Sequence, residues 1–302
     1  MIDILIVNYN CATRLKSLIE NLTHPETAVI SRRADYEITV IDNNSRDGSV
    51  TMMESQFPGV TVIPRSSNDG YSAAINEGLA STGNRDILLL NSDVLITPAA
   101  VAAMARIWER LDFPGIIGPL HFEEDGFPQL TWGSSPTAVS EKRRQRLDRA
   151  LARRETWARQ EVLAEACRTR EVDWVSGSCM FFARSTVEDI GPWDQNYFLY
   201  FEDIDWCLRA KEKGYRVYHT SEAQITHAHG ASTANEPDAV ELEYRRSQCY
   251  FTKKHFGSWA LFKCRSYLTA KQVGRWLIGH RSGFDRRTTR TILREIWRKP
   301  GV

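Results

Sequence analysis

The sequence predicts an α/β protein with a mostly parallel sheet flanked by helices and a helical appendage at the C-terminus. Short apolar runs alternate with helical patterns over about the first 95 residues, as they do in βαβ units. Several of these runs end in asparagine or aspartate, which indicates a polar site at one edge of the sheet. Residues 257–302 differ in composition, because basic and aromatic side chains are interleaved there.

The composition is typical of a globular protein with one large domain or one domain plus appendages. A chain of 302 residues with 42% hydrophobic and 25% charged side chains can bury a sizeable core. A net charge of +1 does not indicate nucleic acid as a partner. We find no apolar run near the ~20 residues that span a bilayer, and no secretory signal. The six cysteines form no Cys-x-x-Cys pair, so we expect reduced thiols in a cytoplasmic protein.

Four apolar runs in the N-terminal part predict buried parallel strands. They are Asp3–Asn8, Glu37–Asp42, Val60–Ile63 and Asp86–Asn91. Helices are expected between them, over about Thr13–Asn21, after the polar turn at 43–49, and over Gly70–Ala80. Right-handed crossovers would set the topology of these units.

Three of the predicted strands end in polar residues that would meet at one edge. They end at Asn8, at Asp42-Asn43-Asn44 and at Asn91-Ser92-Asp93. One such residue is usually part of a turn, but three at the same edge favour a polar ligand site. No Gly-x-Gly-x-x-Gly follows the first strand and no Gly-Lys-Ser/Thr is present, so neither a dinucleotide cofactor nor a P-loop is expected.

The stretch Tyr197–Arg209 combines aromatic residues with three carboxylates. Apolar chain leads directly into Glu202, Asp203 and Asp205 at the start of a helix that we expect to end before Gly214. Asp205 and Arg209 are four apart and can pair on one helix face. An ionised Asp at the mouth of a pocket suits a general base, whereas acids at a helix start also complement the dipole. The spacing leaves both interpretations open, and the aromatic residues can be pocket or core.

Two regions differ from this α/β pattern. Residues 140–170 are dense in charge, with Leu147, Leu151, Ala158 and Val162 at helical spacing, so we expect one long, solvated amphipathic helix. From Lys253 onward there are thirteen Lys and Arg against two acids, and aromatic side chains are interleaved. Such helices suit an anionic membrane surface, or their aromatics pack on the core. Nucleic acid is not expected, because no recognition motif is present. Between these two regions, residues 172–183, 216–219 and 223–226 read as further strands.

An ordered series of motifs resembles the inverting GT-A glycosyltransferases of family 2, in the branch of bacterial rhamnosyltransferases. The motifs are Ile6–Asn10, Val40–Ser45, Asn68–Ser72, Leu89–Asp93, Trp174–Gly177, Phe198–Asp205 and His227–Ser232. The resemblance covers about residues 1–256, with a nucleotide-binding half at 1–95 and an acceptor and catalytic half at 96–256. It does not explain the insertion at 140–170 or the tail at 257–302.

The resemblance implies a role for each matched residue. The donor nucleotide would be bound by Asn8, Asp42, Asn43, Asn68, Gly70, Asn91 and Ser92. Asp93 and His227 would hold Mg²⁺ or Mn²⁺ on the donor diphosphate, with His229 as the near alternative to His227. Asp203 would be the catalytic base, with Glu202 beside it. Trp174 and Arg245 are further candidates, although a solvated helix also explains Arg245. Asn91 stands where the family pattern has the first acid of Asp-x-Asp, which leaves Asp93 as the one carboxylate ligand.

The function implied by the resemblance is transfer of a sugar from a nucleotide-sugar to a polysaccharide or lipid-linked glycan. The first candidate for this sugar is L-rhamnose, carried by dTDP-rhamnose. The protein would act in the cytoplasm, peripherally on the inner face of the membrane. Users of UDP-hexoses share these motifs, and an inactive nucleotide-sugar-binding partner of a glycan-assembly complex is a second alternative. A nucleotidyltransferase is less consistent with the sequence, because the first strand is followed by Asn8-Tyr9-Asn10-Cys11 instead of a glycine-rich basic loop.

Overall fold

The computed structural model describes residues 2–23, 36–83, 85–111, 114–228, 237–278 and 286–298. The strands are β1 (Ile2–Asn8), β2 (Tyr36–Asp42), β3 (Thr61–Pro64), β4 (Asp86–Asn91), β5 (Val94–Leu95), β6 (Pro114–Phe122), β7 (Trp132–Gly133), β8 (Arg170–Val172), β9 (Trp174–Val175), β10 (Cys179–Phe182) and β11 (Arg216–His227). The helices are α1 (Ala12–Thr23), α3 (Ser49–Gln56), α4 (Tyr71–Ser81), α5 (Pro98–Arg110), α6 (Ala138–Ala152), α7 (Thr156–Ala166), α8 (Arg184–Ile190), α9 (Glu202–Glu212), α10 (Pro237–Ile278) and α11 (Arg286–Trp297).

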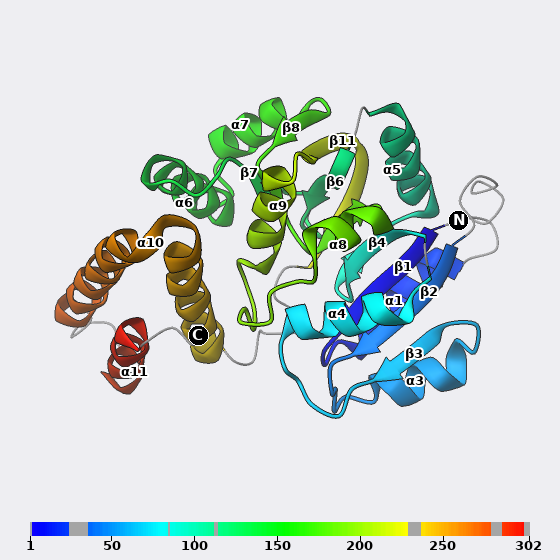
Figure 1. Ribbon diagram of the computed structural model, residues 1–302, viewed down its shortest axis with the longest axis horizontal. Helices are drawn as coiled ribbons and strands as arrows, with labels where there is room; N and C mark the ends of the chain where they lie inside the picture. The colour runs from blue at the N-terminus through cyan, green and yellow to red at the C-terminus, as the bar shows by residue number, and fades with distance from the viewer. Residues whose placement is uncertain are drawn as a thin grey trace.

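A mixed sheet in the order β3-β2-β1-β4-β10-β6-β11-β5 forms the centre of the molecule, and β8 pairs with β11 (Figure 1). Strands β1 to β4 are parallel, which confirms the predicted βαβ units. In the second half, β10 runs antiparallel to β4 and β6, whereas β11 is parallel to β6. Strands β7 and β9 form a separate antiparallel ribbon.

The register of the parallel strands brings the predicted polar strand ends to one edge. Asn8 lies opposite Asp42, and Val7 lies opposite Asn91. The strand order changes direction at β1, and ligands in open α/β sheets bind at this kind of position. The convergence expected from the sequence is therefore present.

Alternate residues of the central strands contact two different apolar layers. Ile4, Ile6, Leu88 and Leu90 pack with α1, α3 and α5 on one face. Leu5, Val7, Ile87 and Leu89 pack on the other face in the layer that includes α4, α8 and α9. This period of two is the reason that near-continuous apolar runs form a strand buried on both faces.

The insertion at 140–170 is two helices rather than the single solvated helix predicted. Helix α6 ends at Ala152, Arg154 adopts a left-handed backbone (φ 58°), and α7 begins at Thr156. The four apolar residues at helical spacing are all buried in the main core instead of forming a thin surface stripe. Their burial fixes the insertion on the domain.

Two strand predictions also need correction. Residues 172–183 are interrupted at Asp173 and again at 176–178, so they form parts of three short strands. Residues 216–227 form a single strand, β11, with an irregularity in its pairing to β6 between Thr220 and Gln224.

Helix α10 consists of two limbs that meet at Gly257, where φ is 79° and ψ is −179° (Figure 1). The bend lies at the start of the predicted tail at 257–302, and the domain boundary itself stays a prediction. The second limb packs with α11 through Leu261, Leu268, Ile292 and Ile296. Within the described ranges, none of the helices combines the length and apolarity that crossing a membrane requires.

Candidate active site

A cavity of about 240 Å³ brings together six of the predicted site residues. They are Asn91, Asp93, Trp174, Glu202, Asp203 and His227. These residues come from the end of β4, from β9, from the start of α9 and from the end of β11. Segments that are more than 130 positions apart in the sequence therefore contribute to one site.

Asp203, in the first turn of α9, is held by two backbone donors. Its Oδ2 accepts from the Gly177 N–H at 2.9 Å, and its Oδ1 accepts from the Ile204 N–H at 2.8 Å. Burial raises the pKa of Asp203, while these N–H groups and the nearby Arg144 guanidinium act in the opposite direction. The result is a fixed carboxyl that is more basic than an ordinary aspartate and suited to accepting a proton.

Glu202, its neighbour, lies in a different environment. Glu202 is 5% exposed, and its Oε2 has no hydrogen-bond partner among the described residues. Burial, together with the adjacent Asp203 carboxylate, raises the pKa of Glu202 well above its usual range. Two carboxyls with different surroundings differ in their tendency to hold a proton, and burial favours the neutral form of Glu202 more strongly than that of Asp203; the catalytic roles of both stay predictions.

The turn that leads into α9 contains two consecutive left-handed residues. Tyr200 and Phe201 both have φ 69°, which is uncommon for aromatic side chains and costs about 1–3 kcal/mol at each residue. The first limb of α10 stabilises this turn, because Tyr244 packs against both rings and the Ser247 hydroxyl donates to the Leu199 carbonyl at 2.8 Å. Helix α10 therefore helps to position the two carboxyls.

Asp93 and His227 form a pair that is suited to a cation. His227 Nε2 lies 3.3 Å from Asp93 Oδ1, and both residues are buried. The Gln129 amide nitrogen donates to the backbone carbonyl of His227 at 2.9 Å, which fixes the orientation of the amide. The Gln129 Oε1 then lies 3.1 Å from His227 Nδ1 and accepts the proton of Nδ1. In a neutral ring Nε2 then presents a lone pair to a carboxylate oxygen. Two acceptors at this distance require a proton or a metal ion between them.

The residues at the ends of β1 and β2 form a connected hydrogen-bond network. The Asn8 amide donates to Asp42 Oδ1 at 2.7 Å, and Asp42 Oδ2 accepts from the Ser45 N–H at 2.8 Å. The Asn43 amide donates to Asn68 Oδ1 at 2.8 Å, which also accepts from the Gly70 N–H. Asp42 is 2% exposed and both of its oxygens are used, so here it orders the loop. A direct contact from Asp42 to a nucleotide stays a prediction.

Ser92 and Arg245 do not line the cavity. Ser92 is 4% exposed and lies outside the lining of the cavity. Arg245 bonds Gln248 and Glu241 on its own helix, in agreement with the structural alternative. His229 lies outside the described residues. Trp174 is held by a bond from its Nε1 to the Ser134 carbonyl at 3.0 Å.

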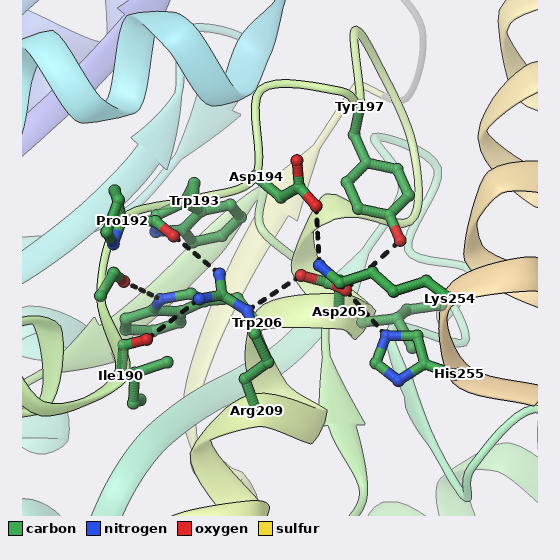
Figure 2. Close-up of polar contacts among 12 residues, drawn as sticks. Ile190, Pro192, Trp193, Asp194, Tyr197, Asp205, Trp206, Arg209, Lys254 and His255 are labelled. Carbon is green, nitrogen blue, oxygen red and sulfur yellow. Dashed lines mark hydrogen bonds and ion pairs between the residues drawn. The ribbon is translucent and has the colours of Figure 1, made fainter. Parts of the chain in front are cut away.

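Asp205 does not face the cavity but anchors α9 to α10 (Figure 2). The predicted pair with Arg209 is confirmed, with Nε 3.0 Å from Oδ2. Lys254 Nζ and His255 Nε2 each lie 2.7 Å from Oδ1, although both belong to α10. The side chain of Asp205 is fully buried, and the positive charges of Arg209 and Lys254 compensate its charge.

Sequence reasoning missed three residues that line the cavity or support its walls. Arg144 lies in the insertion, where it bonds Glu141, Asp148 and the Tyr244 hydroxyl at 3.0–3.1 Å. Tyr244 and Gln129 lie in segments without a recognised motif. Only the dense charge of α6 drew attention to its region, and that pattern is equally typical of a solvated helix.

The fold and the acidic cavity define the GT-A class of sugar transferases. A family model described as glycosyl transferase family 2 matches residues 3–191, and the protein belongs to this family and is a glycosyltransferase. An N-acetylglucosaminyl-diphospho-decaprenol L-rhamnosyltransferase of Mycobacterium tuberculosis is 24% identical over 277 residues, 86% of either chain.

Two further similarities agree with this assignment. The low-salt glycan biosynthesis hexosyltransferase Agl10 of Haloferax volcanii is 26% identical over 225 residues, which are 72% of this chain and 63% of the relative. The mannosyltransferase PcManGT from Pyrobaculum calidifontis, solved with GDP-Man and Mn²⁺, superposes with a TM-score of 0.55 at 14% identity. That comparison covers 98% of this chain and 84% of PcManGT, and it supports the fold.

Proposed function

We propose that this glycosyltransferase is inverting and metal-dependent, and that it moves L-rhamnose from dTDP-rhamnose to a polysaccharide or lipid-linked glycan. The observation that carries the proposal is that Asp203 lines the same cavity as the Asp93–His227 pair. A proton acceptor for the nucleophile and a cation site for the leaving group would then serve one substrate. The sugar and the lipid-linked acceptor are suggested by the name of the mycobacterial relative.

In the proposed reaction an acceptor hydroxyl loses its proton to Asp203 as its oxygen attacks the anomeric carbon of the donor. The bond from that carbon to the diphosphate oxygen breaks, and the nucleotide diphosphate leaves with the electron pair. Attack from the opposite face inverts the configuration. Neutral Glu202 adds no negative charge beside the base, and the N–H groups of Gly177 and Ile204 keep the carboxylate aligned.

A divalent ion fits the donor atoms at the Asp93–His227 pair. Asp93 Oδ1 and His227 Nε2 would hold it, and Asn91 offers a buried Oδ1 without a partner among the described residues. The described chain has no cluster of three or more His, Cys, Asp or Glu for a metal, so phosphate and water would complete the shell, as is common for Mg²⁺. An imidazole ligand shifts the preference towards Mn²⁺. When bound, the ion would neutralise charge on the diphosphate.

We also propose that the second limb of α10, with α11, contacts an anionic membrane surface on the cytoplasmic side. Trp259 is 67% exposed and stacks on the exposed Phe262. Lys263 lies over the Trp259 ring, and Arg265 over the exposed Trp297. Exposed aromatic rings with adjacent cations suit the interface of an anionic bilayer. Co-sedimentation with phosphatidylglycerol vesicles but not with phosphatidylcholine vesicles, lost on W259S/F262S substitution, is expected. Equal recovery with both vesicle types would reject this contact.

The test of the enzymatic proposal is a panel of nucleotide-sugars with Mn²⁺ or Mg²⁺, measured by release of nucleotide diphosphate. Hydrolysis of dTDP-rhamnose above the other donors is expected. A preference for a UDP-hexose would replace the sugar and keep the reaction. If no dTDP- or UDP-sugar is bound or hydrolysed, the protein is better explained as an inactive partner in glycan assembly.

A further inference from the structure

A second cavity, of about 430 Å³, adjoins the catalytic cavity. Leu130, Arg144 and Trp174 line both cavities, so these three side chains form the boundary between them. The other walls come from the insertion helices α6 and α7, from β8 and from the C-terminal end of α9. The catalytic cavity alone is smaller than the ~300–1,000 Å³ of most ligand sites, and the second cavity falls within that range.

The charged side chains of the second cavity are balanced. Its cations are Arg143, Arg144, Arg170 and Lys211, and its anions are Glu141, Glu165, Glu171 and Asp173. Most of them pair with each other, as Lys211 does with Asp173 and Arg170 with Glu165. A diphosphate would require an excess of positive charge, which this cavity lacks. Guanidinium donors beside carboxylate acceptors suit an uncharged ligand that is rich in hydroxyl groups.

Two buried donors of the lining have no partner among the described residues. They are the Nε of Arg170 and the indole Nε1 of Trp132, a residue that is 1% exposed. Both nitrogens are buried from solvent, and a buried N–H without an acceptor is costly. At the boundary, a Cβ at Gly133 would come within 3.0–3.1 Å of three atoms of the Trp174 ring. A larger residue at this position would therefore press on the ring that borders both cavities.

We propose that the second cavity binds the sugar unit that precedes the reacting sugar in a glycan acceptor. The proposal rests on the proposed transferase function, because the reacting hydroxyl must lie at Asp203. A glycan would pass from there between Arg144 and Trp174 and place its next unit among the paired charges. The acceptor class is accordingly an oligosaccharide of at least two units, recognised through uncharged hydroxyl groups.

The test uses membranes of the organism that encodes the protein as the acceptor source, with the radiolabelled nucleotide-sugar that the donor panel identifies. Glu171→Ala and Arg143→Ala remove exposed side chains that line only the second cavity. Each is expected to raise the amount of membrane needed for half-maximal incorporation about tenfold, the usual effect of losing a hydrogen bond to a charged group. The KM for the donor should not rise in parallel. Glu188→Ala, exposed on α8 and outside both cavities, is the matched control.

Three outcomes separate the possibilities. A selective rise in the acceptor requirement supports the second sugar site. If Glu171→Ala and Arg143→Ala need no more membrane than Glu188→Ala, the second sugar site is overturned. A parallel loss of donor and acceptor affinity also overturns it, because it would indicate a damaged fold. Absence of donor turnover by the wild-type protein would instead contradict the transferase function, whatever the variants do.

Discussion

Tyr71 donates its backbone N–H to the carbonyl oxygen of Phe198 at 2.8 Å, and this bond joins the start of α4 to the turn that leads into α9. The Tyr71 hydroxyl in turn donates to the Gly177 carbonyl at 2.9 Å, and the Gly177 N–H binds Asp203. The predicted nucleotide loop and the carboxyl that we propose as the base are therefore connected through one side chain. Such a connection would fix the distance between the proposed donor site and Asp203.

Gly70→Ala should disrupt this connection. A Cβ at Gly70 would lie 2.6 Å from the Phe198 oxygen, and the φ of 96° is itself unfavourable for alanine. We expect a loss of stability above the ~1 kcal/mol of a simple backbone effect, together with a raised KM for the donor. Gly48→Ala is the control, because Gly48 has φ 82° but open space around its Cβ. Equal melting temperatures and equal KM values for the two variants would show that the Phe198 contact is unimportant.

Asp203→Asn and Glu202→Gln should differ strongly in turnover. Loss of a general base costs ~10²–10⁴-fold, so Asp203→Asn should lower kcat by that order while donor binding survives. Glutamine resembles the neutral acid that Glu202 forms, and we expect Glu202→Gln to lose less than about tenfold. The measurement is kcat for transfer, with donor affinity from calorimetry. A larger loss from Glu202→Gln would reverse the two roles.

The buried Glu202 should also make the folding stability depend on pH. Its folded-state pKa is raised, so its stabilising contribution is complete below the ordinary glutamate pKa of ~4.3 and is lost as pH rises towards the folded value. Glutamine carries no charge at any pH. The stability of Glu202→Gln relative to wild type should therefore increase by about 1 kcal/mol or more between pH 4 and pH 8. Denaturant unfolding at both pH values measures it, and a constant difference would mean that Glu202 is not buried in its neutral form.

The part of the site that the sequence predicted comes from residues whose position follows from local rules. Asn8, Asp42 and Asn91 end parallel strands, and such ends must meet at one edge. The pair of Asp205 with Arg209 follows from helical spacing.

The remaining partners depend on tertiary contacts that no local pattern specifies. Lys254 and His255 reach Asp205 from about 50 positions away, and the break in the insertion occurs at Arg154, a residue without a preference for a left-handed backbone. Arg144 enters the cavity wall because the apolar residues of the same helix are buried. A helical pattern indicates that such a stripe exists, but not which surface covers it.

Gln129→Leu should weaken metal binding without removing a ligand. Gln129 fixes the His227 ring so that Nε2 faces Asp93, and loss of such a supporting contact costs ~10–100-fold in metal affinity. The Mn²⁺ concentration for half-maximal activity should rise by that factor, and saturating Mn²⁺ should restore most of the turnover. Gln145→Leu, on the insertion helix α6, is the control. Unchanged Mn²⁺ dependence in Gln129→Leu would indicate that His227 does not bind the ion.

Asp205→Ala tests whether α10 belongs to the catalytic unit. Burial opposes ionisation of Asp205, but hydrogen bonds from His255 and Lys254 lower its pKa in the folded protein. The contribution of Asp205 to folding stability is therefore present above the ordinary aspartate pKa, and it is lost as pH falls through the folded-state pKa. Removing it leaves Arg209 and Lys254 beside an empty position, and the breaking of a buried pair typically costs ~3–5 kcal/mol.

Asp125→Ala breaks an exposed pair with Arg154 and should lower the stability far less than Asp205→Ala does. Urea unfolding at pH 7 gives the free energy of unfolding of both variants. At pH 3 the difference in this free energy between Asp205→Ala and wild type should be smaller. Because α10 supports the Leu199–Phe201 turn, Asp205→Ala should also lower kcat under conditions where the variant is fully folded. A variant that loses stability and keeps wild-type kcat would limit α10 to a structural role.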